Sequence, residues 1–464
     1  MKYVLVVPAL ALAAVLAACG DDASYKSVEE LMKPETCMEC HPKHTGEWSG
    51  SMHAYAADDP LFRALNAKGQ RDTNGSLGSF CVQCHAPIAV ALGLTTDGTN
   101  LADVPSWARG VTCYACHNVE SIEGDHNNPI KLAMDQTMRA GVRGPKPVAS
   151  PAHATAYSDL VDAESQKSSQ LCGSCHDLVS PAGVHLERTY AEWQTTIFSS
   201  PDPTRHLSCG SCHMVVRDGP IAEGQGLDVP QRPFGRREHT FPGIDMALTP
   251  FPNMDQQAET IERDLKALLV TRLCVLPDDG GHIDVRLDDV GAGHMFPSGA
   301  TFDRRAWVEV TAYDSDGAVV YSSGTIPPEA PYTDPDQLGD PDLWMMGTPT
   351  FDGQDQPNGL FWQIARIDHP GTLLLPAVTT DPGDPRFFHS TEKSFRVTNL
   401  LPRIARVRAR VLIRPVPMEL LDSLMASGDL TTDLRPMVPT HELVGATQEW
   451  TTDLLPQRCV PDVP

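Results

Sequence analysis

Positive charge is scarce in this chain. Its 464 residues include 36 Lys and Arg against 60 Asp and Glu, which gives a formal net charge of −24 with histidine neutral. A surface of this sign repels nucleic acid and suits basic or metal-rich partners. We therefore expect no nucleic-acid partner.

Long apolar runs are also missing after residue 18. No later stretch reaches the roughly 18 apolar residues that a membrane-spanning helix needs. Residues 1–18 differ, because a Lys at position 2 precedes an apolar stretch broken only by Pro8. That pattern is typical of an export signal rather than of a membrane span. It ends Leu-Ala-Ala-Cys at Cys19, as a bacterial lipoprotein signal does.

This ending predicts that residues 1–18 are removed and that Cys19 carries lipid. An ordinary cleaved signal with an unrelated cysteine is the alternative. Two or more acyl chains would hold the protein stably on a membrane. We expect the periplasmic face or the outer membrane of a Gram-negative bacterium, and Gly20 favours the outer membrane.

Three common catalytic signatures are absent: a phosphate-cradling Gly-rich loop, an HExxH helix and a Gly-x-Ser-x-Gly elbow. What the chain has instead is a repeated Cys-x-x-Cys-His motif, the attachment signature of a c-type haem. Its thiols are three residues apart, so one turn of chain can present both to one porphyrin. The cysteines of the five copies are Cys37 and Cys40, Cys81 and Cys84, Cys113 and Cys116, Cys172 and Cys175, and Cys209 and Cys212.

Rival uses of these cysteines fit less well. A zinc ribbon needs its Cys pairs in twos and has no use for a His after each pair, and five is an odd number. A disulfide framework would vary its spacings, and a thioredoxin-like motif would occur once. We therefore predict five covalently attached haem c groups. The iron of each takes one axial ligand from the motif: His41, His85, His117, His176 and His213.

The motifs divide the chain into two unlike halves. Together with 40 Pro and 35 Gly, which imply much irregular chain, they predict a loop-rich, mainly helical multihaem domain over residues 19–250. Residues 251–272 are expected to hold a linker helix. Strand-like runs follow at 273–276, 283–290, 306–313, 319–322, 403–416 and 441–455, with a hairpin turn at 314–317. Residues 273–464 are thus predicted to form an antiparallel β-sandwich, and the fold class is α+β.

Cys274 and Cys459 lie near the two ends of this second domain. In an exported protein they are expected to form a disulfide, with two free buried thiols as the alternative.

Three stretches resemble multihaem cytochromes of the c-552/c-554 type, which are related to the octahaem hydroxylamine oxidoreductases. They are CMECHPKHTGEWSGSMHAYA, then CGSCHDLVSPAGVHLERTYAEW with the later CGSCHM, and finally GHMFPSG with the following RRAWVEVTAYDSDG. The resemblance implies that the His of a Trp-x-x-Ser-x-His-like segment is a distal ligand, which here is His53. It also implies a ligand at His153. The third stretch resembles a β-domain that follows the haems in some relatives.

Twelve of the 17 histidines lie outside the motifs, and this surplus favours iron held by two imidazoles. Rigid, apolar chain follows His239 and His294, so both are predicted ligands; His294 would join the β-domain to the haem half. The fifth distal ligand is expected from His126, with His185 and His206 as alternatives.

Iron with two protein ligands transfers electrons but does not readily bind substrate. We therefore expect an electron carrier in the cell envelope, between a quinol-oxidising complex or smaller cytochrome and an acceptor. An enzyme acting on a small nitrogen or sulfur compound at one open haem is the first alternative. A structural role, with the β-domain docking another cytochrome or another copy of the chain, is the second.

Overall fold

The structure, a computed structural model, describes residues 25–141, 150–224, 229, 235–328, 330, 338–368 and 372–461. The expected signal at 1–18 and the predicted lipid site at Cys19 lie outside the described residues. No helix in the described part of the chain is long and apolar enough to cross a membrane.

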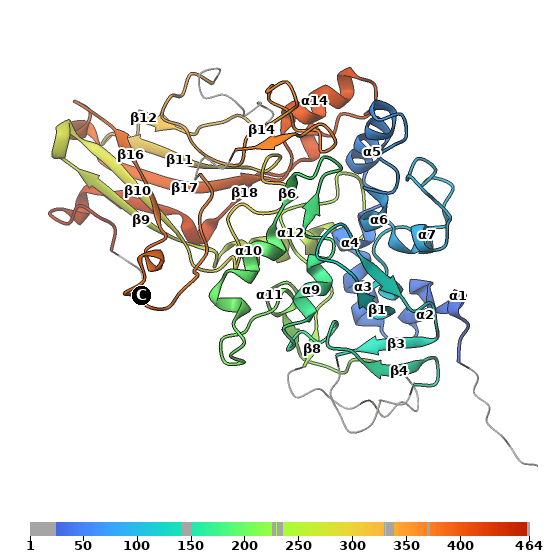
Figure 1. The fold of residues 1–464 in the computed structure, drawn as a ribbon. Coiled ribbons are helices and arrows are strands. Elements are labelled where there is room, and N and C mark those ends of the chain that lie inside the picture. Colours follow the sequence, from blue (N-terminus) through green and yellow to red (C-terminus); the bar gives the residue numbers. More distant parts are fainter. Residues whose placement is uncertain are drawn as a thin grey trace, which may run out of the picture.

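Short helices and loops make up the first half of the chain, the blue-to-green part of Figure 1. The first helix, α1 (Val28–Leu31), begins at the capping box of Ser27 and Glu30. The helices that follow are α2 (Pro34–Met38), α3 (Pro42–Ser49), α4 (Met52–Tyr55), α5 (Pro60–Asp72), α6 (Val82–His85), α7 (Pro87–Ala91), α8 (Cys113–His117), α9 (Ser168–Gly173), α10 (Thr189–Gln194) and α11 (Cys209–His213). Several of them begin with proline, whose fixed φ suits the first helical position and whose missing N–H costs nothing there.

Short strand pairs that the sequence did not predict connect these helices. They are β1 (Val119–Ile122) with β2 (Ile130–Leu132), the parallel pair β3 (Thr137–Ala140) and β4 (Ala154–Tyr157), β5 (Leu178–Val179) with β6 (His185–Glu187), and β7 (Val216–Arg217) with β8 (Arg236–Arg237). Each strand is too short for an alternating pattern to stand out, which is why sequence reasoning missed them.

The linker region contains α12 (Met254–Leu265), which turns Ile261 and Leu265 towards the core. The helix is shorter than expected. Strand β9 (Leu269–Leu276) begins at Leu269 rather than at residue 273, because Leu269 and Thr271 already alternate inward with Leu273.

Two antiparallel sheets form the second half, the yellow-to-red part of Figure 1. One sheet has the order β16 (Thr391–Arg396), β10 (His282–Asp289), β9. The other runs β12 (Val319–Ser323), β11 (Arg305–Tyr313), β17 (Arg406–Arg414), β18 (His441–Glu442), with β13 (Trp344–Met346) on β11 and β19 (Gln448–Thr451) on β17. A separate pair is β14 (Thr350–Phe351) and β15 (Arg366–Ile367). Alternate residues of β10 and β17 are buried in one cluster between the sheets, as in a sandwich.

Most strand predictions agree with these bounds, and the α+β fold class is confirmed. The turn at 314–317 joins β11 to β12, with Gly317 at φ +82° in the left-handed region that such a turn requires. The prediction of one strand over 441–455 is wrong, because a 3₁₀ turn at Val444–Ala446 separates β18 from β19. Helix α14 (Met418–Ala426) was not expected in this half.

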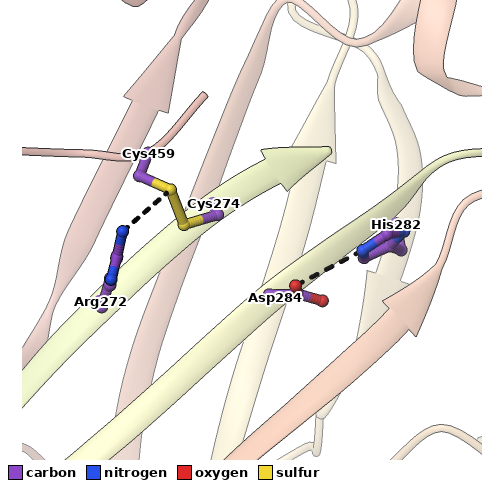
Figure 2. The surroundings of a disulfide bond; sticks show 5 residues. All are labelled: Arg272, Cys274, His282, Asp284 and Cys459. Atoms are coloured by element: carbon purple, nitrogen blue, oxygen red, sulfur yellow. Dashed lines mark hydrogen bonds and ion pairs between the residues drawn. A yellow bond between two sulfur atoms is a disulfide. The ribbon is translucent and has the colours of Figure 1, made fainter. Parts of the chain in front are cut away.

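The expected disulfide is present between Cys274 and Cys459, which are 185 residues apart in sequence. Figure 2 shows that it joins β9 to the C-terminal tail, with the Arg272 side chain 3.8 Å from the Cys459 sulfur. Backbone bonds on either side of the bridge, from Val275 N to Arg458 O and from Val460 N to Leu273 O, extend the sheet to the tail.

Two apolar clusters bury the interface between the halves. In the first, Leu61 and Ala64 of α5 pack with Leu421 and Leu424 of α14, and Figure 1 shows the two helices side by side. In the second, Leu186 of β6 packs with Ala300, Phe302 and Ile364 of the β-domain. The β-domain is therefore packed tightly against the first half of the chain.

Candidate haem sites

A cavity of about 1130 Å³ lies in the first half of the chain and is lined mainly by apolar side chains. The first four motifs all contribute both cysteines and the histidine to its wall. The fifth motif contributes Gly210, and Met214 follows it there. The fold therefore brings motifs that are far apart in sequence together around one cavity.

All ten motif cysteines are free thiols, and Cys212 alone is exposed. Contacts between thiols show which motifs are neighbours. A hydrogen bond with the other motif's thiol, followed by burial, raises the pKa of one cysteine in each contact well above its usual value. The contacts are Cys113 with Cys37, Cys84 with Cys175, and Cys172 with Cys209.

These contacts place the first motif beside the third, the second beside the fourth, and the fourth beside the fifth. The third and fourth motifs are also close, because burial and then the charge of Cys175 raise the pKa of Cys116 to about 12. The spatial order is thus first, third, fourth and fifth, with the second branching from the fourth.

The motif histidines are oriented by backbone carbonyls. Nδ1 donates a hydrogen bond to a carbonyl oxygen in four of the five: His41 to Ile221 (2.7 Å), His85 to Ala56 (2.8 Å), His117 to Arg139 (2.7 Å) and His213 to Pro242 (2.7 Å). A carbonyl can only accept, so each ring is protonated at Nδ1 and keeps its Nε2 lone pair for a metal. This is the usual way in which proteins orient an imidazole ligand.

His53, the predicted distal ligand, lies opposite His176 of the fourth motif. Their ring centroids are 6.3 Å apart. With a metal–nitrogen bond of about 2.0 Å, imidazoles on opposite faces of one ion have centroids about 6 Å apart. Burial, and then the proximity of His176, lowers the pKa of His53 to about 3, so the ring is neutral and able to bind metal.

His239 has the same relation to His117 of the third motif. The two centroids are 6.3 Å apart and the rings are nearly parallel, at 18°. Nδ1 of His239 donates to the Arg237 carbonyl at 2.9 Å, which leaves Nε2 free. Burial, followed by the proximity of His44 and His117, lowers the pKa of His239 well below its usual value.

His294 reaches the fifth motif from the β-domain. Its Nδ1 donates to the Met295 carbonyl at 2.9 Å. Burial lowers its pKa to about 4, against the effect of that hydrogen bond, and the charged neighbours that contribute are His213 and His176.

His153 is the remaining distal candidate near a motif. Its Nδ1 donates to the Ala154 carbonyl at 3.1 Å. Burial lowers its pKa, the hydrogen bond to Ala154 opposes that shift, and His41 of the first motif adds to it. His41, His44 and His153 all line the cavity, and the ring centroids of His41 and His44 are 5.9 Å apart, so the first motif has two neighbouring imidazoles.

His85 of the second motif is different. Within the described residues no second imidazole is in ring contact with it, and the Phe62 ring stacks on it at 3.9 Å. The expected fifth ligand, His126, is instead bonded to Asp125 at 2.6 Å with 40% of its side chain exposed. Of the two alternatives, His185 is bonded to Arg188. His206 lies beside Trp193, and neither of its buried ring nitrogens has a hydrogen-bond partner among the described residues.

Together these residues fit covalently bound haem. Unpaired thiols at the correct spacing line an apolar cavity, and imidazoles oriented by carbonyls face it in pairs. By contrast, no group of three or more His, Cys, Asp or Glu among the described residues is placed to hold a metal ion directly. Axial pairs on a porphyrin need no such group, since the ring supplies the other ligands.

Comparison with known proteins agrees with this description. Residues 36–118, which contain the first three motifs, match the family described as cytochrome c554 and c-prime. A solved structure, a penta-heme cytochrome c552 from Thermochromatium tepidum, has a similar fold with a TM-score of 0.60 and 20% sequence identity. The match covers 92% of this chain and 100% of that one. No curated protein matches the chain. Residues 36–118 thus match a multihaem c-type cytochrome family, and the fold of the whole chain is that of the penta-heme structure.

Proposed function

We propose that the chain is a pentahaem c-type cytochrome that relays electrons in the cell envelope. The observation that carries the proposal is the pairing of His53 with His176 and of His239 with His117, both at 6.3 Å. Haem bound between two imidazoles supplies an iron that changes oxidation state with little change in geometry. The five motifs, and the penta-heme description of the similar structure, support a count of five.

The order of the motifs supports transfer through the protein. Thiol contacts link the first motif to the third and the fourth to the fifth, and the charge of Cys175 acts on Cys116, so the third and fourth motifs are also close. At the fifth, Cys212 is the exposed cysteine, which places that end of the series at the surface. The residues of this chain thereby hold successive sites close together and open one end to a partner.

The attachment and partners are part of the same proposal. The Leu-Ala-Ala-Cys sequence at Cys19 supports a lipid anchor at the periplasmic face or outer membrane. The net charge of −24 favours a basic redox partner. Another cytochrome or a quinol-oxidising complex fits as donor, and such transient contacts are small and polar. Assembly with further copies of the chain is compatible with this role.

Intact-mass measurement and electron paramagnetic resonance test the proposal. Protein from a host that attaches haem c should carry five haems, and the oxidised protein should show mainly low-spin ferric signals. Colourless or zinc-loaded protein would refute the relay. A spectrum dominated by high-spin iron would refute the paired-imidazole arrangement.

One observation favours a second candidate function, which is chemistry on a small nitrogen or sulfur compound. His85 has no second imidazole in ring contact among the described residues, which would leave one iron face open. A high-spin signal that shifts on addition of nitrite or hydroxylamine would support this function. A purely low-spin spectrum would exclude it.

A further inference from the structure

Glu187 is an acidic residue that the relay as described above does not use. It ends β6, and its side chain lines the cavity together with Cys84 and His85 of the second motif. The Cys84 thiol is close to it: the pKa of Cys84 is raised by the hydrogen bond with Cys175, by burial, and then by the charges of Cys175 and Glu187. Glu187 is half-buried, and the exposed part of its side chain includes a face on the cavity, which bound haem would cover.

No hydrogen bond or ion pair holds the Glu187 carboxylate within the part of the chain that the structure describes. The cation that acts on it most, Arg304, is already paired in a bidentate manner with Asp245 at 2.7 and 2.8 Å. Arg304 also donates to the Pro415 carbonyl at 2.8 Å. The positive charge beside Glu187 is therefore balanced by another carboxylate.

The other acidic groups around Glu187 are mostly partnered. Asp177 pairs with Arg188 at 3.2 Å. Glu192 accepts hydrogen bonds from Ser298 Oγ at 2.6 Å and Met295 N at 3.2 Å. A carboxylate that is buried without a partner favours its protonated form, because ionisation then lacks compensation.

The electrostatics agree with this geometry. Burial raises the pKa of Glu187 to about 7; Arg304 opposes the shift, while Asp245, Asp177 and Glu192 add to it. Electrons that arrive on iron beside this carboxylate add negative charge, which raises its proton affinity further.

We propose that Glu187 takes up a proton when haem at the second motif is reduced, so that the protein couples electron transfer to proton binding there. The proposal deepens the relay and rests on it. The step is balanced: one electron from the relay's donor converts ferric to ferrous iron, and one proton from water converts the carboxylate to a carboxylic acid. On reoxidation both leave.

Redox titration of the haem-loaded, full-length protein between about pH 5 and 9 tests the coupling. In the lower half of this pH range the midpoint potential should change little with pH, since Glu187 is already protonated in the oxidised state. Above about pH 7 the midpoint potential of one haem should fall by up to about 59 mV per pH unit. For a one-electron couple this is the potential that corresponds to a tenfold change in proton activity. Glu187→Gln should remove that slope.

Asp303→Asn is the matched control. Burial also raises the pKa of Asp303 to about 7, with Arg305 and Arg304 opposing, but Asp303 does not line the cavity. This variant should keep the slope. An unchanged slope in Glu187→Gln, or loss of the slope in Asp303→Asn instead, would overturn the proposal and assign the proton to a haem propionate or to Asp303.

Unaltered protein gives a second measurement in case the glutamine variant does not fold. The reduced-minus-oxidised infrared spectrum near neutral pH should gain a protonated carboxyl band that shifts in heavy water. Absence of that band would reject Glu187 as the proton site while leaving the relay intact. Protein without haem would instead reject the relay itself.

Discussion

At the scale of single residues, the distal histidines decide what the irons can do. His53 is paired with His176 of the fourth motif, which lies 123 positions later in the sequence. Its neutral ring and its centroid distance of 6.3 Å both suit an axial ligand. Removing it should therefore open one face of the fourth motif's iron.

His53→Ala should convert one haem from low spin to high spin, because the iron loses a strong imidazole ligand. The measurement is electron paramagnetic resonance of the oxidised protein, with haem content checked by mass. His126→Ala is the control, since His126 is bonded to Asp125 near the surface and should leave the spectrum unchanged. If the two variants have the same spectrum as the unaltered protein, His53 is not a ligand.

The motif residues could be read from the sequence because their signal is local. Two thiols and an imidazole within five residues carry their meaning in the spacing alone. The distal ligands depend on which loop the fold brings to which motif, as in the approach of His239 to His117. Resemblance and composition suggested several of them, but the sequence contains nothing that places His126 away from the cavity or Glu187 within its wall.

At the scale of elements, period-two alternation predicted strands well in the β-domain. In β10 every second residue is buried, and the expected and observed bounds differ by one residue at each end. The run at 441–455 failed because its apolar residues flank a 3₁₀ turn, with Ala446 buried inside it. Helix α14 was missed because the leucines that bury it face the haem half, whose position the sequence does not show.

The disulfide should contribute strongly to the stability of the sandwich. It closes a loop of 185 residues, which removes conformational freedom from the unfolded chain. The double variant Cys274→Ser, Cys459→Ser should lower the free energy of unfolding by about 2–4 kcal/mol. Urea unfolding followed by circular dichroism checks this.

Reductant provides the control for that experiment. Unaltered protein should lose the same stability when the disulfide is reduced, while the double variant should not respond. Equal stability of the two proteins without reductant would show that β9 and the tail are held by their backbone bonds alone.

Asp289, at the end of β10, predicts how the stability of the sandwich depends on pH. It is 1% exposed, and its Oδ2 atom has no hydrogen-bond partner in the described structure. Burial raises its pKa from 3.8 to about 7, against the hydrogen bond from Ala292. The folded state therefore holds the proton more tightly than the unfolded state.

That stabilisation is fully present below about pH 4 and is lost as the pH rises through about 7. Asp289→Asn should thus be more stable than the unaltered protein at pH 8 by on the order of 1–3 kcal/mol, and should gain little at pH 4. Thermal unfolding at both pH values measures the difference. Asp316→Asn, at an exposed turn position, is the control; a variant effect equal at both pH values would contradict the assignment.

At the scale of the whole molecule, the two halves act as one structure. Apolar clusters join α5 to α14 and β6 to the loops that precede β11 and follow β14. Arg304 of the β-domain pairs with Asp245 of the connecting segment beside the cavity. The sandwich thus forms part of the environment in which the cofactors lie.

His294 allows the link between the β-domain and the haem half to be tested. It belongs to the loop between β10 and β11, yet its pKa is influenced by His213 and His176 of the haem half. Its neighbour Met295 donates its N–H to Glu192 of α10 at 3.2 Å, and Ser298 Oγ donates to the same carboxylate at 2.6 Å. The loop is therefore fixed against the haem half on both sides of the cis Phe296-Pro297 bond.

His294→Ala should convert one haem to high spin while leaving the sandwich folded, because the loop keeps its bonds to Glu192. His389→Ala is the control: His389 is another histidine of the β-domain, and its Nε2 lies 3.1 Å from the Asp289 carbonyl. Spin state and circular dichroism are measured on both. An unaltered low-spin spectrum in His294→Ala would mean that the β-domain supplies no ligand, and that packing alone joins the two halves.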